Sequence, residues 1–213
     1  MPRSTSANEE MRERSRRRIL DAALVVFAER GYTGATISQI AARAEVARGL
    51  VTYYFATKDE LLEALLSEAL QTMYGATAPP PGERTADERL AGLIDRTLQG
   101  AAAGVDVQRL LLSLMLQPAT RATYAKAEQA NMAALEQAED RIRAIFAERG
   151  AADPGAEEAT LRSVLEGVIF KLAVYPETYP LAAVRARLFR MYDLPITEPT
   201  PPRPAERLRT SGL

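Results

Sequence analysis

The side chains in this sequence that are best suited to chemistry lie together between Thr36 and Leu61. Over residues 48–54 the chain reads Arg-Gly-Leu-Val-Thr-Tyr-Tyr, which places one arginine beside several hydroxyl groups. Arginine can pair with the edge of guanine, and threonine or tyrosine hydroxyls can bind phosphate. No pair of carboxylates or tyrosines has the spacing of a catalytic acid and base. These residue types therefore indicate recognition of nucleic acid.

The residues before this segment predict a short helix. Ile37, Ile40 and Ala44 recur at helical spacing. Thr36 and Gln39 have the spacing of a capping box, which satisfies free amides at the start of a helix. A turn must follow before the next helical segment begins.

A second short helix is predicted after the turn. Val46 and Val51 anchor it, while Arg48, Thr52 and Tyr53 point outward. Two short helices at a steep angle can place the second one in the major groove of DNA. The alternative is an ordinary helical hairpin whose polar residues are only solvated. The preceding segment favours DNA over that alternative.

The preceding helix begins in a run of arginines and then shows one apolar face. It is predicted to stop at Gly31, which can adopt a left-handed conformation. Residues 1–58 hold 10 Lys and Arg against 6 Asp and Glu, whereas the whole chain has a net charge of −1. The excess of positive charge thus coincides with the predicted reading helix, which favours nucleic acid over a membrane or an acidic protein. The arginines of the run are Arg12, Arg14, Arg16, Arg17 and Arg18.

The segment resembles the N-terminal signature of the TetR-type bacterial transcriptional regulators. Ten positions fall on that signature in register, and the resemblance covers about the first third of the chain. They are Thr36, Ile37, Ile40, Ala41, Ala44, Val46, Gly49, Phe55, Lys58 and Leu61. The resemblance implies that seven residues lie at or near DNA, with Lys58 facing a phosphate. These are Thr36, Arg48, Gly49, Thr52, Tyr53, Tyr54 and Lys58.

Three departures from the signature have physical consequences. Glu45 replaces the glycine of the turn, so either Glu45 takes a positive φ at a cost of about 1–2 kcal/mol or the turn has a slightly different form. Ala47 replaces the serine that caps the reading helix, which costs roughly 1 kcal/mol of helix stability unless another oxygen takes its place. Thr52 is shorter than the usual tyrosine, so its phosphate contact is expected to pass to Tyr53.

Composition excludes several other kinds of protein. The chain contains no Cys and no His, which removes disulfides, thiol catalysis and histidine-based sites. The sequence shows no metal-binding cluster and no glycine-rich phosphate loop. It also lacks a secretory segment and an apolar run long enough for a membrane helix. We therefore expect a cytoplasmic protein that needs neither metal nor cofactor and is not an enzyme.

The rest of the sequence reads as helical throughout, so the predicted fold class is all-α. We expect a helix-turn-helix DNA-binding domain at 12–58, a helical ligand-binding and dimerisation domain at 59–194, and a disordered tail at 195–213. Residues 1 to about 10 are expected to form a mobile arm. A long helix with an apolar stripe, from Leu62 to Met73, joins the two domains. Further helices are predicted at about 85–102, 105–117, 120–149, 154–175 and 181–192.

The segment from Val164 to Tyr175 is too apolar to be covered on one side only, because nine of its twelve residues are apolar. Gly167 permits close approach of another helix, and the helix that follows is also amphipathic. A two-helix dimer seam is therefore predicted, as the resemblance also implies. Its residues are Val164, Gly167, Val168, Val184 and Leu188.

The run from Leu110 to Leu116 is also apolar nearly all round. Core packing explains most of it, but the resemblance implies that this helix walls a central pocket for an apolar ligand. The candidate lining residues are Leu112, Met115, Leu116, Tyr124 and Phe170. Glu166, in the most apolar helix, is expected to pair with Arg109 or Arg162, or to meet a cationic ligand group.

Together these observations predict a homodimeric repressor that binds a palindromic double-stranded operator and is released by a small, largely apolar molecule. A DNA-binding regulator without a small-molecule ligand is the first alternative. An all-α enzyme is the second.

Overall fold

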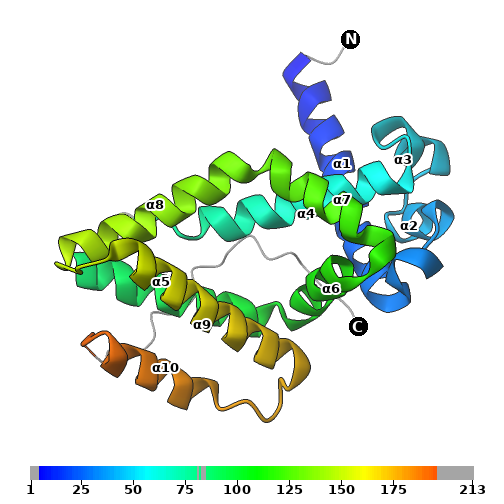
Figure 1. Ribbon diagram of the computed structural model, residues 1–213. Helices are drawn as coiled ribbons and strands as arrows, with labels where there is room; N and C mark the ends of the chain where they lie inside the picture. Colours follow the sequence, from blue (N-terminus) through cyan, green and yellow to red (C-terminus); the bar gives the residue numbers. More distant parts are fainter. Residues whose placement is uncertain (1–4, 81, 83–84, 196–213) are drawn as a thin grey trace.

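The computed structural model describes residues 5–80, 82 and 85–195, and within these it has ten helices and no strand (Figure 1). The all-α prediction is therefore confirmed. The N-terminal helices are α1 (Thr5–Gly34), α2 (Ile37–Arg43) and α3 (Arg48–Tyr54). The remaining helices are α4 (Lys58–Gly75), α5 (Ala86–Ala103), α6 (Val105–Leu116), α7 (Pro118–Ala130), α8 (Met132–Glu148), α9 (Pro154–Val174) and α10 (Leu181–Met191).

The observed helix boundaries correct two expectations. Helix α1 begins at Thr5, so residues 5–10 are helical and do not form the mobile arm that we predicted. The single helix predicted at 120–149 is two helices, because Asn131 is buried and its side chain donates a hydrogen bond of 2.8 Å to the Ala127 carbonyl. An asparagine side chain that bonds to nearby backbone competes with the helix. The predicted tail, apart from Pro195, lies outside the described residues.

Buried apolar side chains form two separate cores. One core joins α1, α2, α3 and α4 to α6 and α7, through residues such as Leu110, Leu114 and Ala127. The other joins α5, α8, α9 and α10. Residues 12–58 therefore share their core with helices from the predicted C-terminal domain. The predicted domain boundary at 58 remains a prediction.

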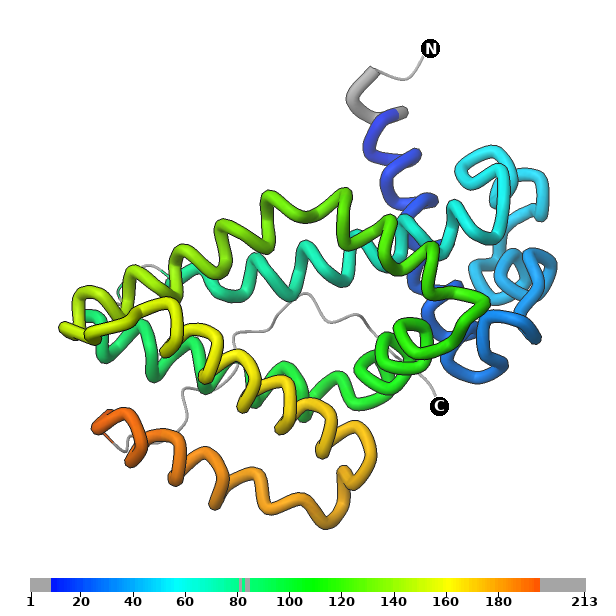
Figure 2. Tube along the Cα trace, viewed as in Figure 1, coloured from blue at the N-terminus to red at the C-terminus, as the bar shows by residue number. Residues whose placement is uncertain are grey.

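Helix α4 connects the N-terminal helices to the rest of the molecule (Figure 2). Leu62, Leu65 and Leu66 of the predicted stripe are buried, as are Leu61 and Leu70. The stripe ends before the last turn, since Met73 is 45% exposed. Burial of five leucines fixes the direction in which α4 leaves the N-terminal unit.

A largely buried ion pair between Arg185 and Asp95 joins helix α10 to α5. Arg185 donates two hydrogen bonds to the carboxylate of Asp95, at 2.5 and 2.7 Å, and its guanidinium lies 4.1 Å from the centre of the Phe189 ring. Such paired bonds fix an orientation as well as a contact. The Arg185–Asp95 contact therefore fixes the orientation of α10 relative to α5.

Candidate nucleic-acid interface

The helix-turn-helix segment folds as the sequence predicts. The Thr36 side chain accepts a hydrogen bond from the Gln39 amide at 3.3 Å, and the Gln39 side chain accepts one from the Thr36 amide at 3.0 Å. Ile40 and Val51 are completely buried. The capping box and these two anchors set the start of α2 and the inner face of α3, so the opposite face of α3 is turned outward.

Of the two forms expected for the turn between α2 and α3, the strained one is observed at Glu45. This residue has φ +52°, a region that costs a residue with a side chain about 1–2 kcal/mol. Arg18 of α1 holds the turn, because it donates a 2.6 Å hydrogen bond to the Ala44 carbonyl and lies 3.4 Å from the Glu45 carboxylate. No local sequence signal predicts this contact, since Arg18 and the turn are far apart along the chain.

Four predicted DNA-contacting residues of α3 are exposed: Arg48, Gly49, Thr52 and Tyr53. A Cβ atom built on Gly49 would have no neighbour within 4 Å, so packing inside the protein does not require glycine there. Glycine in a helix costs roughly 1 kcal/mol relative to alanine. Close approach of another molecule to the backbone is a physical reason to keep it.

The hydroxyl groups of Thr52 and Tyr54 are less available for an outside partner than that of Tyr53. The Thr52 hydroxyl donates to the Gly49 carbonyl at 3.1 Å, so its proton is used inside the helix. Tyr54 is half-buried against the first core and meets the Tyr53 ring edge-on at 5.3 Å. Ala47 provides no side-chain cap, as expected. Tyr53, at 63% exposed, is thus the tyrosine of α3 that faces outward.

Lys58 has a different environment from the phosphate-facing position implied by the resemblance. Its ammonium donates to the backbone carbonyls of Tyr32 at 2.8 Å and Ala35 at 3.0 Å, and it lies 4.3 Å from the centre of the Tyr32 ring. Two of its three N–H groups are therefore used within the protein. Lys58 ties the first turn of α4 to the end of α1 and the start of α2.

A second contact strengthens the same junction. The Tyr32 hydroxyl donates a hydrogen bond to the Asp59 carboxylate. Burial, reinforced by the hydrogen bond to Asp59 and its charge, raises the pKa of Tyr32 well above its usual value. The phenol therefore keeps its proton, and the bond, throughout the neutral pH range.

The predicted dimer residues divide between two faces of the last helices. Val168 and Leu188 are buried in the second core, and Val164 and Val184 pack against it. The prediction that Val168 and Leu188 lie at a seam between subunits is therefore wrong, because both are buried within one subunit. Only Gly167 of the five is exposed.

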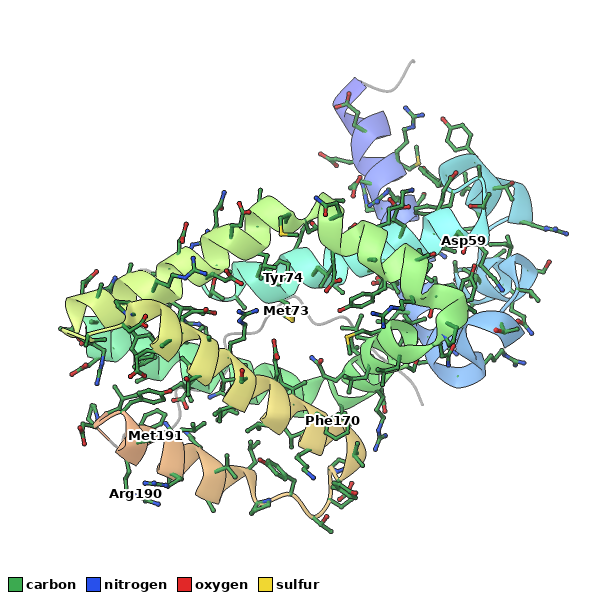
Figure 3. All side chains as sticks on the ribbon, viewed as in Figure 1. Asp59, Met73, Tyr74, Phe170, Arg190 and Met191 are labelled. Atoms are coloured by element: carbon green, nitrogen blue, oxygen red, sulfur yellow. The ribbon has the colours of Figure 1, made fainter. Side chains whose placement is uncertain are left out.

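The predicted ligand-binding residues do not line one common pocket. Leu112, Met115 and Tyr124 are half-buried, and Tyr124 packs on the first core. Leu116 is 66% exposed and Phe170 is 45% exposed, so neighbouring helices enclose neither side chain. Figure 3 shows Phe170 on α9, and Met73 and Tyr74 on α4. The three half-buried residues stay predictions, while Phe170 is part of an outer face.

Glu166 does not pair with either arginine that we expected. Arg162 pairs with Glu158 at 3.0 Å and Glu139 at 3.3 Å, and Arg109 donates to the Ala173 carbonyl at 2.6 Å. The carboxylate of Glu166 instead acts electrostatically on Tyr124, whose pKa is raised to about 12 mainly by burial and further by Glu128 and Glu166.

The helical body also has an open cleft of about 430 Å³, between the α5–α6 junction and the α9–α10 connection. Its lining includes Arg109, Asp106 and Tyr179 but none of the five predicted ligand-binding residues. Among the residues that the structure describes, no group of three or more Asp or Glu side chains is placed to hold a metal ion. No helix in the described segments has the length and apolarity to cross a membrane.

Comparison with known proteins identifies the N-terminal region. Residues 19–65 match the model of a family described as bacterial regulatory proteins, tetR family. The HTH-type transcriptional regulator BetI of Burkholderia thailandensis is 41% identical over 68 residues, which is 32% of this chain and 35% of that protein. BetI of Paraburkholderia phytofirmans is 38% identical over 79 residues, or 37% of this chain and 40% of the relative. The chain thus matches only 35–40% of the length of these curated relatives.

Solved structures extend the likeness to the whole fold. The fatty acid degradation regulator FadR of Bacillus halodurans has a TM-score of 0.63 and 22% identity, over 82% of this chain and 95% of that one. NalD of Pseudomonas aeruginosa, described as the secondary repressor of the MexAB-OprM multidrug efflux pump, has a TM-score of 0.58 and 23% identity, over 84% and 93%. At these identities the likeness shows the fold alone.

These findings define the protein as a helix-turn-helix chain with an additional helical body. Residues 19–65 match the tetR family, and the described helices share the fold of solved regulators such as FadR.

Substitution of Lys58 can distinguish a structural role of its ammonium from a contact with DNA phosphate. We expect Lys58→Met, which keeps most of the aliphatic stem, to lower the free energy of unfolding by about 1.5–3 kcal/mol, because two charge-assisted hydrogen bonds are lost. Urea denaturation measures this. Lys126→Met is the control, since it removes an exposed ion pair with Glu63 and should change stability little. Wild-type stability combined with a weaker salt dependence of DNA binding would instead assign Lys58 to a phosphate.

Proposed function

We propose that this protein is a homodimeric, DNA-binding transcriptional regulator of the cytoplasm. It acts as a repressor on a palindromic operator and is released by a small, largely apolar ligand. The match of residues 19–65 to the tetR family carries the proposal. The outward placement of Arg48, Gly49 and Tyr53 on α3 supports it. The relatives that match this segment are named transcriptional regulators, which argues against an enzyme.

The proposed mode of DNA binding follows from the helix that is turned outward. α3 enters the major groove, where Arg48 near its first turn reads a base edge and Tyr53 reaches a phosphate. Thr36 lies at the exposed start of α2 and contacts the backbone of the duplex. Lys58 and Tyr54 contribute by holding α3 and α4 in place.

The proposed dimer forms through the outer face of α9 and α10. Ser163, Gly167, Phe170 and Val174 recur at intervals of three and four residues, so they share one exposed face of α9. Phe170 and Val174 are each 45% exposed, and Met191 is 43% exposed. Figure 3 shows Phe170 on α9 and Met191 on α10. An apolar face of this kind, with small residues that allow close approach, suits a second copy of the same helices.

The proposed ligand site adjoins α6, beside Leu112, Met115 and Tyr124. Helix α6 packs against both α1 and α9, and its Leu110 and Leu114 lie in the core of the DNA-binding helices. A ligand that displaces α6 would therefore move α1 directly. FadR of Bacillus subtilis, which has the same fold at a TM-score of 0.62 and 22% identity, was solved with stearoyl-CoA. That complex supports an apolar ligand for a protein of this architecture.

Arg48 provides the test of base reading. Arg48→Ala should weaken binding to the operator by about 1–3 kcal/mol and relax the preference at one base position in each half-site, because a paired contact to guanine is lost. Selection of duplexes from a random pool, followed by titration, measures both effects. Unchanged affinity together with an unchanged selected sequence would refute the proposed docking of α3.

Gly167 provides the test of the dimer. Apart from the chain neighbours and the backbone of its own helix, no atom lies within 4 Å of a Cβ built on Gly167, so the surface is open there and Gly167→Leu favours the helix. The variant should sediment as a folded monomer and lose about 10²-fold or more in operator affinity, because the two half-sites are no longer linked. Gly100→Leu on α5, where the space is also open, is the matched control. A dimer that survives Gly167→Leu would rule out this face.

Met115 provides the test of the ligand site. Met115→Trp enlarges a half-buried side chain of α6, and we expect it to shift α6 against α1 and weaken operator binding roughly tenfold without any ligand. Leu116→Trp is the control, because Leu116 is 66% exposed on the same helix. Fluorescence anisotropy with labelled operator measures both. Equal, wild-type affinity in the two variants would show that this part of α6 does not control DNA binding.

A further inference from the structure

The first turns of α1 extend beyond the compact N-terminal unit and lie beside α3 (Figure 1). One contact joins the two helices near the exposed end of α3. The Arg12 guanidinium donates a hydrogen bond to the Tyr53 hydroxyl, and its centre lies 5.8 Å from the centre of the Tyr53 ring. Arg16, one turn further along the same face of α1, lies 5.6 Å from the centre of the Phe55 ring. α1 is therefore attached to the reading segment by two arginine–aromatic contacts.

The arginines of this extension differ in their partners. Arg14 lies on another face of α1, is 75% exposed, and pairs with Glu10 at 3.5 Å. Arg16 lies 3.9 Å from Glu13. Among the described residues no carboxylate forms an ion pair with Arg12, and its contact with Tyr53 uses one of five N–H donors. The positive charge of Arg12 is thus placed on the outward side of α3, next to the tyrosine that faces solvent.

From this geometry we infer that Arg12 and Tyr53 together bind a DNA phosphate, so that the extension of α1 is a second DNA-contacting element beside the helix-turn-helix. This inference rests on the proposed DNA-binding function. The arginine supplies the charge and two or more N–H donors, and the tyrosine hydroxyl, which accepts from Arg12, keeps its own proton for a phosphate oxygen. Glu9 lies one turn further out and would repel phosphate, so the contact ends at Arg12.

Salt dependence provides the test, with a duplex selected by the wild-type protein from a random pool as the probe. Arg12→Gln should weaken binding by about eightfold for each subunit at 0.1 M salt and reduce the slope of log affinity against log salt by about one for each subunit. Arg14→Gln, on the same helix, is the matched control and should leave both quantities at wild-type values. Arg12→Lys should keep the slope, because the charge remains.

The outcomes separate this inference from the proposed function. If the wild-type protein selects no duplex, the proposed function fails. If the wild-type protein binds but Arg12→Gln behaves like Arg14→Gln, α1 does not contact DNA and the inference fails alone. Loss of affinity in Arg12→Gln with an unchanged salt slope would also overturn it, because Arg12 would then only position Tyr53. Circular dichroism of each variant checks that α1 remains helical.

Discussion

The ammonium of Lys58 occupies the junction on which the arrangement of the N-terminal helices depends. It bonds to two carbonyls, those of Tyr32 and Ala35, just where α1 ends and α2 is about to begin. Orphan carbonyls at a helix end need partners, and a cation is the most favourable one. Because Lys58 is also the first residue of α4, the same bonds fix the direction of α4 relative to the reading helix.

Two helices carry this arrangement into the rest of the molecule. α4 leaves the junction with a buried row of leucines, and α6 returns to the same core through Leu110 and Leu114. The reading unit is therefore packed against the body by two separate helices. A change in the body that moves α6 must either move α1 or open this core, and cores resist opening. This is the physical basis on which we propose that a ligand could control DNA binding.

Local sequence signals predicted local structure well. The Thr36–Gln39 capping box, the positive φ at Gly31 and the strained turn at Glu45 are all decided by neighbouring residues, and all three are present. Contacts between distant residues could not be predicted, such as that of Arg18 with the turn. Of the outer face of α9, only Gly167 was predicted as a dimer residue. Val168 and Phe170 are both apolar, and only the packed structure shows that Val168 points inward and Phe170 outward.

We propose that two copies of α3 enter successive major grooves on one side of a duplex. Hydroxyl-radical footprinting on a selected operator tests this directly. We predict two protected segments whose centres lie about 34–36 Å apart, or one helical turn, related by the symmetry of the site. A single protected segment, or protection that does not depend on sequence, would contradict this placement of the two α3 helices.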